Sequence, residues 1–245
     1  MNRKFALILA SLITLLIANS IYFFSLSSDN KMMETVILSR VIDGDTFESE
    51  DGRTFRLANI NAPEKGIVGE DLSKDYLRTF QNKSLEIENL GKDKYDRSLV
   101  RLYSAEYLNL KIVELGMASK FLVEKSELKR FADAEEKAIS NERGIWMKSP
   151  SFGCVRSHIQ AREEIVVFNK ICDTDNEGWY VKDESRKIYY FNISFFSIKL
   201  HSGKGEQNNT DLFWQSATDI WNNDRDSLYV FDQEGKIIHY HAYGY

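Results

Sequence analysis

The sequence has few prolines, few cysteines and no excess of positive charge. Its 245 residues include 2 prolines, 2 cysteines and 32 Lys and Arg against 37 Asp and Glu, for a formal net charge of −5. Neither half is basic, because residues 31–150 carry 20 basic against 22 acidic side chains and residues 151–245 carry 10 against 14. Binding of a polyanion through overall charge would be weak, so chemistry on nucleic acid would need individual arginines or a metal ion.

Internal repeats and low-complexity tracts are also missing. Hydrophobic residues make up 43% of the chain and charged residues 28%, which excludes wholesale disorder. A chain of this length is expected to form two domains of about 100 residues each.

One long apolar run stands at the N-terminus. Phe5 to Leu26 is a stretch of 22 residues without a charge, long enough to cross a bilayer as a helix. Arg3 and Lys4 precede it and place the N-terminus in the cytoplasm. We interpret residues 1–30 as an uncleaved signal anchor; the alternative is a signal peptide cleaved near Ala18 to Ser20. Either interpretation predicts an extracytoplasmic protein, which is membrane-anchored in the first case and secreted in the second.

Residues 31–149 combine short strands with helices. Alternating apolar residues predict strands in ETVILSRVI, DTFESE, RTFRLANI, SLEIENL and RSLVRLYS, and Asp51-Gly52 predicts a tight hairpin. Helices are expected over residues 69–83, 108–117 and 126–144, and glycines end the second and third. Five short strands with interleaved helices predict a small closed barrel.

The pattern changes after Pro150, where we place the domain boundary. Residues 151–245 contain strand-like segments only, separated by Asp, Asn and Gly turns. Regular short strands of this kind predict a β-sandwich.

Candidate catalytic residues concentrate around the first hairpin. Hydrolysis of a phosphodiester needs cations directed at the phosphate oxygens and a carboxylate that positions or deprotonates water. Arg56 and Arg97 suit the first task, because a guanidinium binds phosphate oxygens bidentately. Glu64 suits the second, and Asp45 with Asn61 offers hard oxygen ligands to a calcium ion.

Four motifs together resemble the staphylococcal-nuclease-like (thermonuclease) family. They are VIDGDTF, FRLANINAPE, DKYDRSLVRLY and ADAEEKAISNERGIW, and the resemblance spans about residues 34–148. It implies an α+β fold with a five-stranded OB-type barrel and three helices. It also implies calcium-dependent hydrolysis of DNA and RNA.

The resemblance assigns roles position by position. It implies that Asp45, Asn61 and the backbone carbonyl of Ala62 hold calcium, that the two arginines clamp the phosphate and that Glu64 acts on water. Tyr95 would contact a nucleotide phosphate. The best-known family members have Asp where this chain has Asn61, which puts its calcium affinity in doubt.

The second domain resembles the lamin-tail domain, an immunoglobulin-like β-sandwich fused to secreted and membrane-associated nucleases. The segments that carry this resemblance include EGWYVKDE, LHSGKG, WNNDRDSLYVFD and GKIIHY. It implies a binding or spacing module, whose partner the sequence does not identify.

The second domain also contains both cysteines and a histidine pair. If strands pair around Glu163, Cys154 and Cys172 lie opposite each other and within bridging range; the alternative is two free, buried thiols. His239 and His241 share one face of a strand, and we expect a solvated terminal strand in preference to half of a metal site.

The sequence therefore predicts a membrane-anchored, extracytoplasmic, calcium-dependent nuclease with DNA or RNA as substrate. The rival hypotheses are a nucleic-acid-binding protein without catalysis and a cell-surface adhesion protein. The combination of Arg56, Glu64 and Arg97 favours the nuclease, because a protein that only binds nucleic acid has no need of all three.

Overall fold

The computed structural model describes residues 13–15, 17, 19 and 33–245. The predicted signal anchor, residues 1–30, lies outside the described residues apart from those five positions. In the described part of the chain, no helix is both long and apolar enough to cross a membrane. Thr35–Tyr245 forms one compact unit, and the fold below belongs to it.

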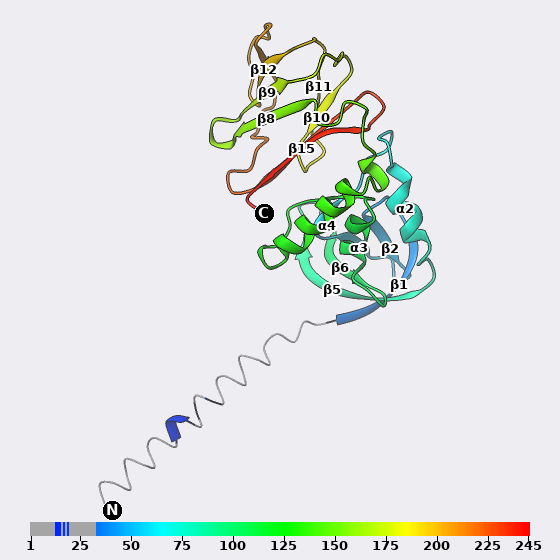
Figure 1. Cartoon of the computed structure of the whole chain (residues 1–245). Coiled ribbons are helices and arrows are strands. Elements are labelled where there is room, and N and C mark those ends of the chain that lie inside the picture. The colour runs from blue at the N-terminus through cyan, green and yellow to red at the C-terminus, as the bar shows by residue number, and fades with distance from the viewer. Residues whose placement is uncertain (1–12, 16, 18, 20–32) are drawn as a thin grey trace, which may run out of the picture. The chain divides into compact units, whose positions relative to one another are not determined.

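Five strands close into a barrel in the order β1-β2-β3-β6-β5 (Figure 1). They are β1 (Met33–Val41), β2 (Thr46–Ser49), β3 (Thr54–Leu57), β5 (Ser84–Lys92) and β6 (Ser98–Tyr103). The predicted hairpin joins β2 to β3, and Gly52 in its turn has a φ of 83°, a conformation that favours glycine. The five-stranded barrel is therefore confirmed.

Three helices accompany the barrel, as predicted (Figure 1). They are α2 (Glu70–Arg78), α3 (Leu108–Glu114) and α4 (Leu128–Ser140), with 3₁₀ turns η1 (Lys125–Glu127) and η2 (Gly144–Trp146) before and after α4. Gly116 follows α3 with a φ of 69°, and a Cβ there would lie 2.2 Å from the Arg143 carbonyl oxygen. Glycine thus ends α3 and lets the segment after α4 pack closely against it.

A two-stranded ribbon lies outside the barrel sheet. Its strands β4 (Ile60–Asn61) and β7 (Ser119–Lys120) are antiparallel, with Asn61 opposite Ser119. Strands of two residues are too short to show alternation, so the sequence pattern gave no sign of β7. The ribbon places Asn61 and Lys120 next to the second half of the chain.

Two four-stranded sheets follow the barrel (Figure 1). One has the order β11 (Ile188–Tyr190), β10 (Tyr180–Lys182), β14 (Asp226–Phe231), β15 (Ile237–Tyr243). The other has the order β13 (Asp211–Phe213), β12 (Ser197–His201), β9 (Ile165–Lys170), β8 (Val155–Gln160), and the turn η3 (Ala161–Glu163) joins β8 to β9. Residues from both sheets form one buried core, among them Phe168, Leu200, Trp221 and Leu228. The predicted β-rich second half is confirmed, whereas its lamin-tail identity stays a prediction.

Cys154 and Cys172 form a disulfide whose Cα atoms are 5.1 Å apart. The predicted register of the hairpin was wrong by one residue. Gln160 pairs with Ile165, and the amide of Ile171 donates to the carbonyl of Cys154. The 3₁₀ turn and Glu164, in a left-handed conformation with a φ of 54°, make a four-residue connection that shifts the pairing.

The histidine pair is not solvated, so that expectation was wrong. His239 Nε2 and His241 Nδ1 each lie 2.9 Å from Ser157 Oγ on β8, and both side chains are half-buried. Burial lowers the pKa of His239 to about 4, and burial also lowers the pKa of His241. The pair therefore links the two sheets in its neutral form.

Acidification is expected to destabilise the protein through this pair. The folded-state pKa of His239 is below its unfolded value. The free energy of unfolding therefore has its full value above about pH 6.5, and the contribution of neutral His239 is lost as the pH falls toward 4. His239→Gln keeps a polar partner for Ser157 but does not titrate, so its melting temperature should fall less between about pH 7 and about pH 5. Thermal unfolding at both pH values tests this, and equal losses in wild type and variant would contradict it.

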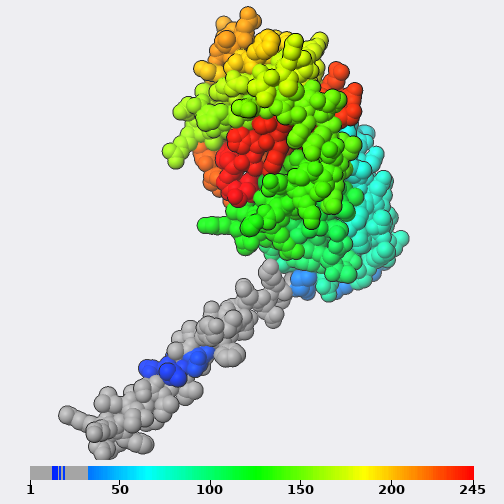
Figure 2. Space-filling model, viewed as in Figure 1, coloured from blue at the N-terminus to red at the C-terminus, as the bar shows by residue number. Residues whose placement is uncertain are grey.

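The barrel and the sandwich share a buried apolar core. Ile139, Ile145 and Trp146 from the end of the barrel domain pack with Tyr229 and Phe231 of β14. The Trp146 ring is stacked with that of Tyr229, with centroids 5.1 Å apart. In the space-filling view the red C-terminal strand borders green atoms of the helical segment (Figure 2). Because each half covers apolar surface of the other, we expect either half alone to be less stable than the pair. The boundary at Pro150 itself stays a prediction.

Candidate active site

A buried ion pair lies at the site, and of its two members Asp45 lines the cleft described below whereas Arg56 does not. Asp45 and Arg56 are only 1% and 6% exposed, and Arg56 Nη2 lies 3.1 Å from Asp45 Oδ2. The same carboxylate oxygen accepts a hydrogen bond from the backbone N–H of Ala62 at 3.1 Å. Burial raises the pKa of Asp45, and the positive charge of Arg56 opposes this shift. The pair thus joins the first hairpin to the segment that carries Ala62.

Backbone carbonyls fix the orientation of the Arg56 guanidinium. Its Nη1 donates to the carbonyl of Leu57 at 2.6 Å and to that of Ile60 at 3.1 Å. Register in the β2–β3 hairpin places Arg56 opposite Thr46, next to Asp45. The guanidinium is therefore held by the chain that follows it, as a preorganised charge requires.

Arg97 reaches the same place from the turn between β5 and β6. Its Nε donates to Asp93 Oδ2 at 2.7 Å, and its Nη1 lies 3.4 Å from Thr46 Oγ1. Thr46 in turn donates to Asp45 Oδ1 at 3.0 Å, so contacts run continuously from Arg97 to the buried pair. Tyr95 is 67% exposed, and its ring centroid lies 5.4 Å from the Arg97 guanidinium carbon. The structure thus brings the two predicted arginines, Asp45 and Tyr95 to one side of the barrel.

A cleft of about 370 Å³ opens beside the ion pair. We call it the acidic cleft, because its lining includes five carboxylates, Asp43, Asp45, Glu64, Glu70 and Asp71, against three cations, Lys65, Lys74 and Arg186. Gly44 also lines it, and a Cβ at that position would lie 2.6 Å from the Cβ of Ala62. Glycine at position 44 therefore permits the loop after β1 to approach the segment that carries Ala62.

Glu64 lies at the edge of the acidic cleft with its side chain 46% exposed. Its carboxylate pairs with Arg186 Nε, from the loop between β10 and β11 of the sandwich. Sequence reasoning missed Arg186, because nothing near it in the sequence connects it to the first hairpin. The contact shows that the second half of the chain takes part in the candidate site.

Asn61 is not among the residues that line the acidic cleft. Its Nδ2 donates to the carbonyls of Glu184 and Ser185, each at 3.2 Å, and its Oδ1 lies 3.5 Å from Arg56 Nη2. An amide can donate to two carbonyls, whereas a carboxylate can only accept. These two acceptors suit an amide at position 61, and Asn61 attaches the β10–β11 loop to the barrel.

Asn61→Asp is expected to weaken this attachment. The new carboxylate would face two carbonyl oxygens without a donor, which costs about 1–3 kcal/mol of unfolding free energy. Urea unfolding should show a lower midpoint for Asn61→Asp than for wild type. Asn89→Asp on β5, whose side chain accepts a hydrogen bond from the Gly91 amide, serves as the control and should unfold like wild type. An unchanged midpoint for Asn61→Asp would contradict the docking role.

The donor set fits a calcium ion in part. Asp45 and Ala62 line the acidic cleft and can offer the hard oxygen ligands that calcium prefers, whereas the Asn61 amide is committed to the loop. Among the described residues, no cluster of three or more Asp, Glu, His or Cys side chains is arranged to hold a metal. A calcium ion here would therefore depend on Asp45, the Ala62 carbonyl and water molecules.

Comparison with known families gives one match. Residues 54–148 match the family model described as Staphylococcal nuclease homologue. The matched segment contains Arg56, Glu64, Tyr95 and Arg97, and it ends just after η2. No curated protein matches the chain in sequence. Residues 54–148 thus have a nuclease-type fold.

Proposed function

We propose that the protein is a nuclease that hydrolyses phosphodiester bonds of DNA or RNA. The observation that carries the proposal is a cleft lined by Asp45 and Glu64, with Arg56 paired to Asp45 directly behind the lining. Arg97 joins the same set of contacts through Thr46. The family match of residues 54–148 supports the same reaction class.

The side chains divide the chemistry between them. Arg56 and Arg97 bind the phosphate oxygens and stabilise the negative charge that develops on them during attack by water. Glu64, the exposed carboxylate at the edge of the cleft, positions that water and accepts its proton. Tyr95, on the surface beside Arg97, contacts a phosphate further along the nucleotide chain.

Calcium is the proposed cofactor. When bound, a divalent cation supplies positive charge beside the phosphate oxygens. Asp45 and the Ala62 carbonyl would hold it, and a site with one direct carboxylate is expected to bind calcium weakly. Weak binding suits an extracytoplasmic enzyme, because calcium sites in extracellular modules work at about 10⁻⁴ to 10⁻³ M.

The proposed location is extracytoplasmic, with residues 1–30 as a membrane anchor or a cleaved signal. The uncharged run from Phe5 to Leu26 supports export, and the bond between Cys154 and Cys172 is compatible with an oxidising compartment. DNA or RNA is the proposed substrate, and the lamin-tail-like half is proposed to belong to the same exported enzyme.

A calcium titration of DNA cleavage tests the function and the metal together. The full chain should cleave single-stranded DNA in calcium and stop in chelator. Asp45→Asn should raise the calcium concentration for half-maximal cleavage, because it removes the direct carboxylate. Asp71→Asn, an exposed residue at the cleft mouth, is the control and should move the midpoint less. Cleavage that is indifferent to chelator would overturn the metal assignment, and no cleavage with any divalent cation would overturn the nuclease.

A further inference from the structure

A second pocket of about 270 Å³ lies between the barrel and the sandwich, next to the acidic cleft. The two share the segment from Ala62 to Lys65 and also Arg186. Three of the four charged side chains in this second pocket are cations, namely Lys65, Lys182 and Arg186, and the fourth is Glu64. We call it the basic pocket. Glu64 therefore stands where the acidic cleft meets a pocket whose charged side chains are mostly cationic.

Lys182 has an ammonium group that makes no direct ion pair among the described residues. It is the last residue of β10, and its Nζ lies 5.6 Å from the ring centroid of Tyr229. In the described part of the chain it forms no ion pair or hydrogen bond. Burial lowers its pKa, and the carboxylates of Asp183, Glu135, Glu184 and Glu64, in that order, oppose the shift. A desolvated cation of this kind gains from an anion that enters the pocket.

Arg186 lines the pocket from the β10–β11 loop, which carries hydrogen bonds of its own. Asp183 Oδ1 accepts hydrogen bonds from the Ser185 amide at 2.9 Å and from its hydroxyl at 2.6 Å. The Asn61 amide holds the same loop from the barrel side. Arg186 also lies close enough to Arg56 for its charge to lower the pKa of that guanidinium. Its side chain is 48% exposed, so it can exchange Glu64 for another anion.

The rest of the lining is largely apolar. Val68, Ile145, Ile188 and Phe231 contribute side chains from both halves of the chain. Apolar walls with a few fixed polar groups are the usual form of a small-ligand site. A sugar or base can pack on such walls while its phosphate meets the cations.

We propose that Lys182 and Arg186 form a second phosphate subsite, which binds the phosphate next to the scissile one on a nucleic-acid strand. The nucleotide between the two phosphates packs on the apolar walls. That the neighbouring phosphate is the one cleaved rests on the proposed nuclease function, whereas the subsite itself rests on the basic pocket. The sandwich thereby supplies substrate-binding residues and is more than a spacer.

Binding measured without turnover tests the subsite. Fluorescence anisotropy with the full chain in chelator would follow a short, labelled single-stranded DNA. A matched set of strands would carry one neutral methylphosphonate linkage at successive positions. Lys182→Met and Arg186→Gln should each weaken binding of the unmodified strand about tenfold or more. Each should reduce the slope of log K against log salt by about 0.7.

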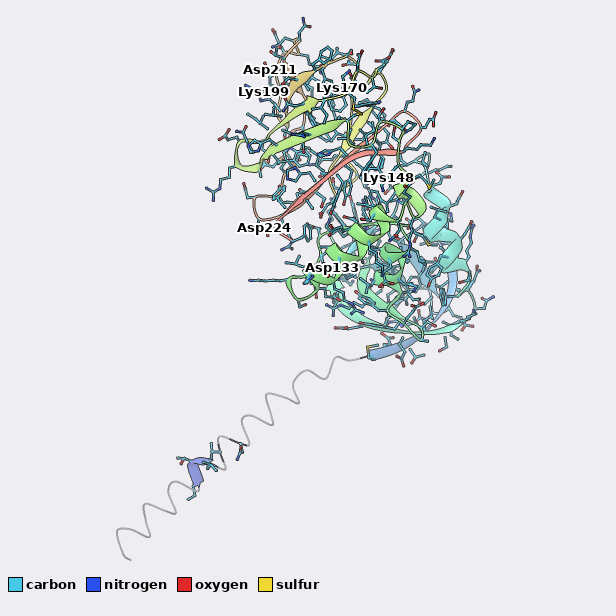
Figure 3. All side chains as sticks on the ribbon, in the orientation of Figure 1. Asp133, Lys148, Lys170, Lys199, Asp211 and Asp224 are labelled. Atoms are coloured by element: carbon cyan, nitrogen blue, oxygen red, sulfur yellow. A yellow bond between two sulfur atoms is a disulfide. The ribbon has the colours of Figure 1, made fainter. Side chains whose placement is uncertain are left out.

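The neutral linkage separates a specific contact from general charge. In wild type, a neutral linkage should cost affinity at the scissile phosphate and at the phosphate next to it. In the two variants the cost at the second of these positions should largely disappear, whereas the cost at the scissile phosphate should remain. Lys199→Gln is the matched control: it removes the same charge from an exposed position on β12, distant from the barrel (Figure 3), and should bind like wild type. Lys182→Arg and Arg186→Lys should retain most of the affinity. Thermal unfolding of all four variants checks that each is folded.

Three results would overturn the subsite. They are wild-type affinity in Lys182→Met and Arg186→Gln, an equal loss in Lys199→Gln, and an undiminished cost in both variants at each linkage position that costs affinity in wild type. The nuclease proposal fails separately, because a protein that shows the binding pattern but never cleaves keeps the subsite and loses the reaction. Cleavage without the binding pattern would support the nuclease and overturn the subsite.

Discussion

Glu64→Gln is expected to lower the turnover number for DNA cleavage by at least about 10²-fold, the scale of general-base catalysis. Glutamine keeps the size of the side chain but cannot accept a proton from water. The side chain is 46% exposed and its one ion pair, with Arg186, lies at the surface, so the fold should survive. Turnover at saturating DNA and thermal unfolding of the same preparation measure both effects.

Glu86→Gln provides the matched control, because Glu86 is an exposed residue of β5 outside the acidic cleft. Its turnover should equal that of wild type. Arg97→Lys should also lose turnover, since a lysine cannot bind phosphate bidentately. Arg56 is a poorer test, because its removal would leave Asp45 buried without its partner. Near wild-type turnover in Glu64→Gln would show that another group activates the water.

Lys120→Met is expected to cost about 3–5 kcal/mol of unfolding free energy, because it leaves a buried charge without its partner. Lys120 Nζ lies 2.5 Å from Glu135 Oε2, and both side chains are 0% exposed. Glu135 also accepts hydrogen bonds from the hydroxyls of Tyr229 and Tyr240, which belong to the sandwich. The pair is thus the polar centre of the contact between the two halves.

A double-mutant cycle measures the coupling between Lys120 and Glu135, although Lys120 Nζ also lies 3.4 Å from Glu184 Oε1, whose loss contributes to the single variant. Lys120→Met combined with Glu135→Gln removes both charges and should recover part of the loss of the single variant. Lys129→Met breaks an exposed ion pair with Asp133 on α4 (Figure 3) and should change the unfolding midpoint little. Urea unfolding of wild type, Lys120→Met, Glu135→Gln and the double variant gives the cycle. If Lys120→Met unfolds like Lys129→Met, the buried pair does not hold the halves together.

The sequence was sufficient where the signal is local. Asp51-Gly52 predicted the hairpin, Gly116 marked the end of α3, and alternation placed the barrel strands. Gly144 was wrong as the end of the third helix, because α4 ends at Ser140 and Gly144 begins η2. Arg56, Arg97 and Asp45 were predicted to meet, and their contacts run through Thr46. Each of these features depends on residues close in sequence or on motifs with fixed spacing.

The sequence was insufficient where distant segments meet. Arg186, Lys182 and the carbonyls that bind Asn61 all come from the β10–β11 region, and only the folded chain brings them to Glu64. The one-residue error in the β8–β9 register has a similar origin, because a 3₁₀ turn and one left-handed residue set the connection. The buried histidines followed the same pattern, since their partner Ser157 lies in the other sheet.

The most direct test of the account is cleavage of labelled single-stranded DNA by the full chain in millimolar calcium, with Glu64→Gln assayed beside it. The account predicts that wild type cleaves the strand, that chelator stops it and that Glu64→Gln loses at least about 10²-fold in rate. Absence of cleavage by wild type, or equal cleavage by Glu64→Gln, would contradict the assignment of this cleft as a nuclease active site.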